Sequence, residues 1–523
     1  MRNTRASCEL SRTMCAALHS RNNPCWQPSS DSQFCFLGAL TTAKMRSDSM
    51  TEGLLEQAKP HVETPEVLAG AERQPSPPAV APVRAEERIP ALDTIRGFAL
   101  LGILLMNICS FGLPDAAYAN PAPAGGATGW NFLTWCIMEV LADGKMRAIF
   151  SLTFGAGVYL LIDRLSRRGA AENAADIHYR RMLWLMLFGM LHAYLIWDGD
   201  ILFYYAVLGL VLYPLRKLSP RALLIAAGFV LIVMSVGAAF LHGHLMDEQR
   251  EYVGIKADER AGIKLTAAQA DTKKDWEEIV ARQAPTAEDL KTEADAHQGG
   301  YFKLLIFRAK NVYRLHSAPL YWPNPWFDML MMMLVGIAMI KSGVLTGAYP
   351  KKCYVLMALV SFAIGIPADT WAVWYITQHH FSIDAFSLIL SEYEFGRFTA
   401  FGYIALIILT LKLGILRGAT RTLAYVGQMA FTNYILTSLI CTTLFEGYGF
   451  GLFGKLQRYQ LYGIVLLVWL LILTLSPLWL RRFRFGPLEW VWRSLTYWKR
   501  QPFRRDRSVG PSVGLATRPD TLR

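Results

Sequence analysis

Charged residues are scarce in this sequence: Asp, Glu, Lys and Arg make up 18% of its 523 residues, against about 25% in a typical soluble chain. Hydrophobic residues make up 53%. They gather in stretches of roughly 17–25 residues, each long enough to cross a lipid bilayer. The shortage of charge therefore excludes a soluble enzyme and a wholly disordered chain, and it indicates a body embedded in a membrane.

Metal-binding cysteine patterns and the short catalytic motifs are missing as well. The eight cysteines include no CxxC pair and no pair flanked by histidines, so we expect neither a metal site nor a disulfide framework. No P-loop, GxSxG, HExxH or GxGxxG motif stands in the context that its chemistry needs. The formal net charge of +12 does not indicate a nucleic-acid partner, because the excess lies in short loops and in the tail after Leu480.

Residues 1–88 are polar and carry no apolar stretch behind a basic start, so they predict a disordered tail and linker rather than a signal peptide. The segment Gln74–Val83 is rich in Pro, as is typical of an extended linker. Met45 and Met50 are alternative start sites to Met1.

The body of the chain, residues 89–498, contains ten apolar stretches that predict membrane crossings. These runs must be helical, because in hydrocarbon every backbone polar group needs an internal partner. The expected crossings are 94–113, 147–163, 180–197, 200–216, 221–243, 325–341, 353–376, 397–413, 421–445 and 459–480. The sequence thus predicts an all-α, polytopic transmembrane helical bundle of ten crossings, or eleven if residues 130–142 also cross. We interpret 130–142 as a re-entrant or interfacial helix.

Lys and Arg alternate between successive loops, and this alternation orients the predicted bundle. The loops 197–200 and 377–396 contain neither residue type. Basic residues lie in the loops 163–181, 214–221, 341–352 and 412–421. Because cytoplasmic loops carry an excess of Lys and Arg, we expect both termini, including the tail 499–523, in the cytoplasm of a bacterial inner membrane. The long segment 245–322 is then extracytoplasmic, and we expect it to form surface helices over the outer mouth of the bundle.

The first crossing carries an arginine and an asparagine on nearly one face. Arg96 and Asn107 are eleven residues apart, which leaves them about 20° off one face and about 16 Å apart along the axis. A polar group inside a span is costly and indicates a functional role. The alternative is that Arg96 snorkels to the headgroups and Asn107 makes an interhelical hydrogen bond.

A histidine, two acids and a tyrosine converge in the third and fourth crossings. His192 precedes the tight turn that holds Asp198 and Asp200, and the next helix runs straight back, which brings Tyr204 or Tyr205 to the depth of His192. Histidine is the usual general base, and a carboxylate orients its ring. The alternative is a hydrogen-bonded core histidine, with Asp198 capping the following helix.

Further polar side chains predict a cavity that opens outward. The residues expected at this level are Asp328, Asp369, Glu392, Glu394, Arg397 and Asn433. Lys145 and Arg147 fall on the same side, where they can pair with these acids. Glu394 and Arg397 also fit a plain surface pair three residues apart. The cytoplasmic side is ringed by Arg96, Arg164, Arg180 and Arg181.

Stretches at both ends of the body resemble a known family. They are Leu92-Asp93-Thr94-Ile95-Arg96-Gly97 with Asn107, Phe150–Gly157, Leu191–Tyr194, Gly427–Tyr434 and Phe483–Trp498. They resemble the YeiB-like integral membrane proteins, a domain-of-unknown-function family (number four-eighteen) without a settled activity, for which a transport role has been suggested. The resemblance covers residues 89–498. That family is grouped with the membrane acyltransferases, whose opening Leu-Asp-x-x-Arg-Gly is similar.

The resemblance implies acyl transfer. In the related O-acyltransferases an Arg is followed, after ten intervening residues, by a catalytic His; this position is Asn107 here, as in the N-acetyltransferase branch, so His192 is the available base. We expect acyl-CoA to bind at the cytoplasmic face, with a glycan or lipid acceptor outside. Asp198 or Asp200 would orient His192, Asn107 would donate to the oxyanion, and Arg96 would contact phosphate. The further residues expected to bind substrate are Asp93, Tyr205, Asp369, Glu394, Arg397 and Asn433.

Two alternatives stay open. A transporter or exporter is favoured by Asp369 and by the carboxylates near Glu392, which could bind a cation or proton, and it is disfavoured by the lack of a detectable inverted repeat. The other alternative is a non-catalytic membrane scaffold.

Overall fold

The computed structural model describes residues 87–123, 126–317, 325–389 and 396–505. All of them lie within one compact unit, Arg73–Arg523. They form helices joined by turns, and among them the only extended pairing is an isolated bridge between Phe483 and Arg504. The all-α prediction is therefore confirmed. The predicted N-terminal tail lies outside the described residues except for Glu87 and Arg88.

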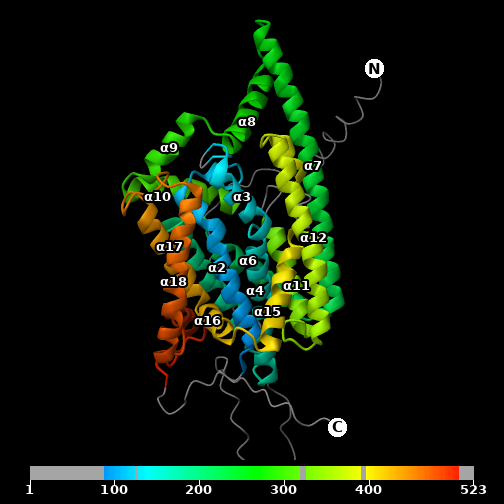
Figure 1. Ribbon diagram of the computed structural model, residues 1–523, viewed down its shortest axis with the longest axis vertical. Helices are drawn as coiled ribbons and strands as arrows, with labels where there is room; N and C mark the ends of the chain where they lie inside the picture. The colour runs from blue at the N-terminus through cyan, green and yellow to red at the C-terminus, as the bar shows by residue number, and fades with distance from the viewer. Residues whose placement is uncertain (1–86, 124–125, 318–324, 390–395, 506–523) are drawn as a thin grey trace, which may run out of the picture. The chain divides into compact units, whose positions relative to one another are not determined.

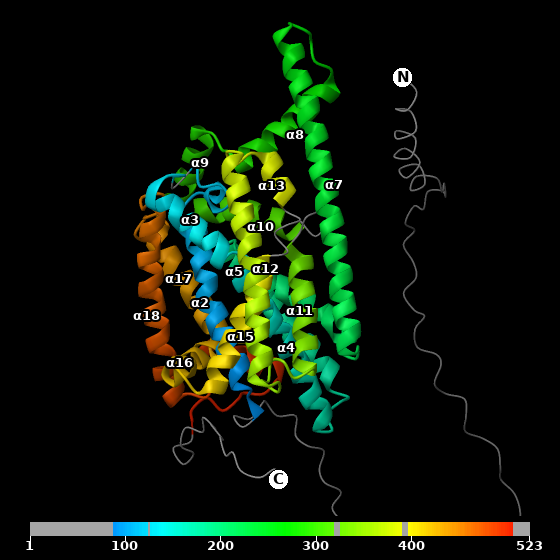
Figure 2. The ribbon, with the colours of Figure 1, turned by 45° about the vertical axis from the view of Figure 1, so that its right-hand side comes forward.

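The long helices run up and down through a bundle, in alternating directions (Figures 1 and 2). They are α2 (Pro90–Gly112), α4 (Lys145–Arg167), α5 (Ala174–Leu195), α6 (Leu202–Leu215), α7 (Pro220–Arg260), α11 (Pro325–Lys341), α12 (Lys351–Gln378), α15 (Phe398–Leu413), α17 (Ala430–Phe445) and α18 (Arg458–Arg482). The first and last described residues lie at the same end, which we call the terminal end. Two short helices lie there, α16 (Arg417–Gln428) and α19 (Pro487–Thr496).

The opposite end, which we call the cap end, carries the remaining elements (Figures 1 and 2). They are η2 (Asp115–Tyr118), α3 (Gly129–Leu141), α8 (Ala267–Gln283), α9 (Ala287–His297), α10 (Tyr301–Ser317) and α13 (Ile383–Ile389). The predicted outer segment 245–322 is thus helical through Ser317, since α7 continues to Arg260 and α8 to α10 follow it. Thr266 and Thr286 begin α8 and α9 with capping boxes.

Five helical stretches among the described residues are long and apolar enough to cross a membrane. They are Pro90–Gly112, Gly129–Arg167, Pro220–Arg260, Lys351–Gln378 and Arg458–Arg482, and the second contains both α3 and α4. The helices α6, α15 and α17 are apolar but shorter. The chain is therefore a helical protein suited to a lipid bilayer, and the expected number of ten crossings is not confirmed.

The prediction of one unbroken helix over 421–445 is wrong. The chain breaks into α16 and α17 at Met429, where φ is −111° and ψ is 27°. The side-chain amide of Asn433 spans the break and donates a hydrogen bond of 3.2 Å to the carbonyl oxygen of Val426. The carboxylate of Glu489 in α19 accepts two backbone hydrogen bonds, of 2.7 and 3.1 Å, from the first turn of α17. A side chain from another helix thus satisfies the donors that the break exposes.

Helices α2 and α16 pack with their backbones in direct contact. A Cβ atom at Gly97 would lie 2.0 Å from the carbonyl oxygen of Leu423, and one at Gly427 would lie 1.9 Å from the carbonyl oxygen of Asp93. Only glycine permits this approach. The contact holds Asp93 and the neighbouring Arg96 at the terminal end.

The segment expected as a re-entrant or interfacial helix, 130–142, forms the separate helix α3. A turn joins it to α4, and Gly144 in this turn has a φ of 68°, a left-handed conformation that favours glycine. Trp130 at the start of α3 is 71% exposed. That α3 stops short of crossing the membrane stays a prediction.

Candidate functional site

A cavity of about 220 Å³, lined by both polar and apolar side chains, lies at the cap end of the bundle. The sequence predicts an outward-opening cavity at this end, and several of the residues expected there line it: Asn107, Arg147, Asp198, Asp200 and Tyr204. Other polar residues that line it are Tyr118 and Asp143. The fold therefore brings an amide donor and two acids from different helices around one space.

His192 and Asp200 form a buried pair beside this cavity. Nδ1 of His192 lies 2.8 Å from Oδ1 of Asp200, and neither side chain is more than 1% exposed. The second carboxylate oxygen of Asp200 accepts a hydrogen bond of 2.7 Å from the N–H of Phe203 in the first turn of α6. The sequence offers Asp198 as the residue that caps α6. In the structure the carboxylate that accepts from the first turn of α6 is that of Asp200. Asp198 instead accepts a hydrogen bond of 3.2 Å from Asn311 in α10.

The second ring nitrogen of His192, Nε2, is buried and has no hydrogen-bond partner among the residues that the structure describes. The imidazole packs against Tyr434 of α17, with ring centroids 5.1 Å apart. The hydroxyl of Tyr434 accepts a hydrogen bond of 3.3 Å from the N–H of Ile201. A neutral imidazole that donates from Nδ1 to a carboxylate leaves Nε2 as an acceptor, which is the form that a general base needs.

The acids predicted near this level are held by basic partners. Nζ of Lys145 lies 2.9 Å from Oδ1 of Asp369, and Lys145 is 1% exposed. Asp328 accepts from Nε of Arg147, at 3.2 Å, and from Nε of Arg397. The predicted pairing of Lys145 and Arg147 with these acids is confirmed. Both aspartates are thus paired with cations of the chain itself, and this pairing offsets the cost of burying their charges.

Three other predicted residues lie elsewhere. Asn433 is at the terminal end, where its side-chain amide also donates a 3.0 Å hydrogen bond to Oγ of Ser476. Tyr205 lines a second cavity described below, and its hydroxyl lies 2.8 Å from Oγ of Ser151. Glu394 is outside the described residues.

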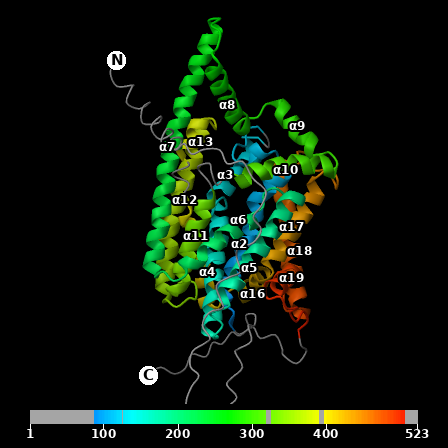
Figure 3. The ribbon, with the colours of Figure 1, turned by 180° about the vertical axis from the view of Figure 1, so that it is seen from behind.

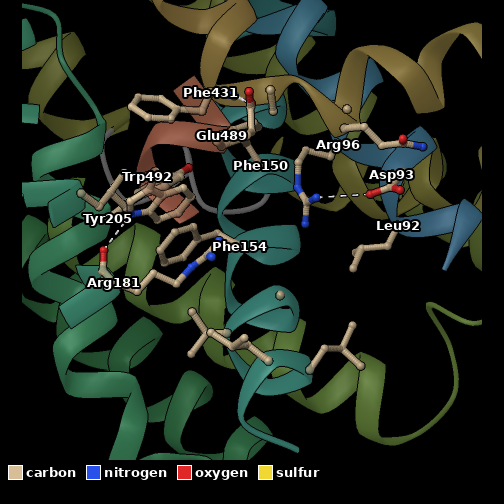
Figure 4. Close-up of a pocket in the computed structure, with 18 of the residues that line it drawn as sticks. Leu92, Asp93, Arg96, Phe150, Phe154, Arg181, Tyr205, Phe431, Glu489 and Trp492 are labelled. Carbon is tan, nitrogen blue, oxygen red and sulfur yellow. Dashed lines mark hydrogen bonds and ion pairs between the residues drawn. The ribbon is translucent and has the colours of Figure 1, made fainter. Parts of the chain in front are cut away.

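The second cavity, of about 240 Å³, lies at the terminal end. Five arginines line it: Arg88, Arg96, Arg164, Arg181 and Arg493. Asp93 and Glu489 accompany them, and NH1 of Arg96 lies 3.4 Å from Asp93. Figure 4 shows Arg96 and Asp93 on one side of the cavity and Arg181 with Trp492 on the other. Arg180, which the sequence also places in this basic ring, pairs with Asp176 and does not line the cavity.

The rest of this cavity is apolar and aromatic. Residues of this kind include Ile103, Phe150, Phe154, Leu161, Leu185 and Leu202. The guanidinium of Arg181 lies 3.7 Å from the centroid of the Trp492 ring. Burial, and then the charges of Arg181 and Arg88, lower the pKa of Arg493 to about 9. Concentrated positive charge beside an apolar wall suits an anion that carries an apolar chain.

Sequence reasoning missed Arg88, Glu489 and Arg493 as lining residues. The available signal is the closing stretch of the resemblance, Phe483–Trp498, which contains both Glu489 and Arg493. No group of three His, Cys, Asp or Glu side chains that could hold a metal is present in the described ranges.

The two cavities adjoin, since Ile103 and Ile201 line both of them. Tyr434 lines the terminal-end cavity and Asp200 lines the cap-end cavity. His192 contacts both of these residues and lines neither cavity. We call these five residues the partition. The histidine and carboxylate thus lie where a reactant from one end could meet a reactant from the other.

Comparison with known proteins gives relatives without an established activity. A family model described as a protein of unknown function (DUF418) matches residues 339–499. The uncharacterized protein YeiB of Escherichia coli (strain K12) is 33% identical over 441 residues, which cover 83% of this chain and 100% of YeiB. The uncharacterized protein YxaH of Bacillus subtilis (strain 168) is 29% identical over 441 residues, 82% of this chain and 100% of YxaH. No solved structure matches the chain significantly.

Proposed function

The chain belongs to the YeiB-like family of membrane proteins of unknown function, and we propose that it transfers an acyl group from acyl-CoA to a glycan or lipid acceptor across a bacterial inner membrane. One observation carries the proposal: an arginine-lined cavity and an acid-lined cavity, at opposite ends of the bundle, adjoin at a partition that holds His192 and Asp200. The basic terminal end then faces the cytoplasm and the cap end faces outward.

The terminal-end cavity suits the donor. Acyl-CoA combines several phosphates with an apolar acyl chain. Arginine binds phosphate in a bidentate manner, and Arg96, Arg164 and Arg181 line this cavity. The apolar wall around Phe150 and Phe154 then receives the acyl chain. The thioester is carried toward the partition while the phosphates stay at the arginines.

The cap-end cavity suits a polar acceptor. Nε2 of His192 takes the proton of the acceptor hydroxyl or amine as its oxygen or nitrogen attacks the thioester carbonyl. Asp200 holds the imidazole in the required tautomer and stabilises the imidazolium. Asn107 donates to the oxyanion. When the intermediate collapses, the carbon–sulfur bond breaks and His192 returns the proton to the departing CoA thiolate, so the acylated acceptor and free CoA leave. Nε2 is buried, and Tyr434 packs against the imidazole, so the reactants must displace neighbouring side chains to reach it.

The test is acyl transfer by the purified full chain in proteoliposomes supplied with labelled acyl-CoA and with glycans and lipids of the cell envelope. The variant His192→Ala should lose roughly 10²–10⁴-fold of the transfer rate, the usual contribution of a general base. The matched control is His178→Asn, because His178 is also a buried histidine of α5 and its Nε2 lies 2.9 Å from the carbonyl oxygen of Gly209. Full transfer by His192→Ala would remove the assigned base.

Transport is the second candidate, because two cavities on opposite sides of a partition also suit alternating access. The ion pairs of Asp369 and Asp328 weigh against these two acids as a cation site. The same proteoliposomes separate the two functions: solute flux without release of CoA would support a transporter, and covalent transfer with release of CoA supports the enzyme.

A further inference from the structure

Helix α10 lies across the cap end of the bundle, against the end of α5 (Figure 3). The hydroxyl of Tyr301 donates a hydrogen bond of 2.9 Å to the carbonyl oxygen of Leu195, the last residue of α5. Arg308 is 2% exposed and reaches Glu446 in the turn after α17, with 3.4 Å between NH2 and Oε1. Leu304 and Val312 are also buried. One face of α10 is therefore fixed to the bundle.

The other face of α10 combines exposed apolar and basic side chains. Phe302 is 78% exposed and Ile306 is 62% exposed. Because these residues are four apart, they lie on one side of the helix. Lys303 and Lys310 are exposed beside them. A helix with aromatic and aliphatic residues next to lysines is typical of a segment that lies in the headgroup layer of a membrane.

A row of leucines on α5 leads directly to this face. Leu183, Leu187, Leu191 and Leu195 follow one another at every fourth residue, and each is 43–51% exposed. On the surface of a bundle suited to a bilayer, an exposed apolar row of this kind is expected to face the lipid tails. The row ends at Leu195, where Tyr301 is attached. The exposed face of α10 thus adjoins this apolar row at the cap end of the bundle.

The turn between α17 and α18 carries further exposed aromatic residues next to α10. Phe450 in this turn is 71% exposed. The ring of Tyr448 lies 5.6 Å from the ring of Tyr301. Aromatic residues at one level of a transmembrane bundle mark the boundary between tails and headgroups. We call Phe302, Lys303, Ile306, Lys310 and Phe450 the headgroup face.

We propose that the headgroup face lies in the headgroup layer of the leaflet at the cap end and binds anionic phospholipids. The apolar side chains enter the upper acyl region, and the two lysines attract the net negative charge that the phosphate gives the headgroup. The inference rests on the membrane location of the bundle and not on acyl transfer, so either can fail without the other.

The same helix also touches the cap-end cavity. Asn311 donates to Asp198, and the carbonyl oxygen of Leu315 accepts a hydrogen bond of 3.2 Å from Tyr204, which lines that cavity. The His316 ring stacks on Phe203 at 4.0 Å. Lipid bound on one face of α10 is therefore separated from the cavity by the width of one helix.

The experiment uses the full chain in vesicles of phosphatidylethanolamine with or without phosphatidylglycerol. The photoreactive residue p-benzoylphenylalanine replaces Phe302 or Phe450 in turn, and mass spectrometry identifies what is cross-linked after illumination. Leu187 is the positive control, since it lies in the lipid-facing row. Val253 is the negative control, since it is 63% exposed on α7 and lies about 15 Å beyond the predicted end of the crossing at residue 243.

We expect both test positions to cross-link to phospholipid, as Leu187 does, and phosphatidylglycerol to be enriched several-fold over its share of the vesicle. The double variant Lys303→Gln and Lys310→Gln should abolish this enrichment and leave cross-linking to phosphatidylethanolamine intact. Cross-linking that matches Val253, cross-linking to a protein instead of lipid, or enrichment that persists in the double variant would each overturn the proposal.

Discussion

The two cavities differ in the way in which the chain balances their charge. Five arginines and two acids line the terminal-end cavity, so positively charged side chains are in excess there. The cap-end cavity is lined by three acids, Asp143, Asp198 and Asp200, and by one arginine, Arg147. Basic side chains are therefore in excess in one cavity, and acidic side chains are in excess in the other.

The comparison also separates binding from chemistry. The arginines gather at the far side of the terminal-end cavity from the partition, since Arg96 lies about 10 Å along α2 from Ile103. The titratable pair lies in the partition itself. Substitutions at the arginines should therefore change affinity, and substitutions at the pair should change rate.

The largest effect is expected at Asp200. The variant Asp200→Asn keeps the shape of the side chain but removes the negative charge that favours the His192 tautomer with the proton on Nδ1. The transfer rate should therefore fall by roughly 10²–10⁴-fold. The comparison variant is Asp198→Asn, two residues away, which keeps an acceptor for the hydrogen bond from Asn311 and should lose less than about 10-fold of the transfer rate. Initial rates with labelled acyl-CoA measure both. Equal losses in the two variants would show that His192 is not the group that Asp200 serves.

A smaller effect, on affinity, is expected at Arg181. Removing one charge-assisted contact in Arg181→Gln should weaken CoA binding by roughly 10–100-fold. Its neighbour Arg180 pairs with Asp176 and does not line the cavity, so Arg180→Gln should bind CoA almost as the unaltered chain does. Titration calorimetry of the detergent-solubilised full chain gives both dissociation constants. A larger loss in Arg180→Gln than in Arg181→Gln would contradict this assignment of the cavity.

The smallest effect is expected at the cap end, as a dependence on pH. Nδ1 of His297 in α9 lies 2.9 Å from Oε2 of Glu446. Burial acts to lower the pKa of His297, but the hydrogen bond and charge of Glu446, with Glu293 and Asp198 further away, raise it above 6.5. Because the folded pKa is the higher one, the pair stabilises the docked α9 fully below pH 6.5, and this contribution is lost as the pH rises through the folded pKa.

Hydrogen exchange of the Gly447 amide reports on this docking, because that N–H donates a hydrogen bond of 2.8 Å to the carbonyl oxygen of His297. Protection should be greater at pH 6 than at pH 8. In His297→Gln the difference between the two pH values should disappear, after correction for the intrinsic exchange rate. Arg308 also holds Glu446, so a pH dependence that survives in His297→Gln would assign the titration to another group.

Some of this arrangement is predictable from the sequence, for a physical reason. An acid among apolar residues, such as Asp369, requires a cation, and the predicted direction of α4 places Lys145 at its level. The break between α16 and α17 is not predictable in this way. Residues 422–445 contain no proline and no charged residue, so they are compatible with a single helix. The donors that the break exposes are satisfied by Glu489, which lies far along the chain. The spacing of apolar residues along the chain predicts local helices, and it gives no information about a distant side chain such as Glu489 that satisfies a helix end.

The position of Glu489 has a practical consequence for the design of shortened proteins. A stop codon placed after α18 would look harmless on a hydropathy plot, since the remaining residues add no apolar stretch. It would nevertheless remove the carboxylate that satisfies the first turn of α17, together with Trp492 and Arg493, which line the terminal-end cavity. Fusion partners and purification tags should therefore be joined downstream of Arg505, so that α19 stays whole.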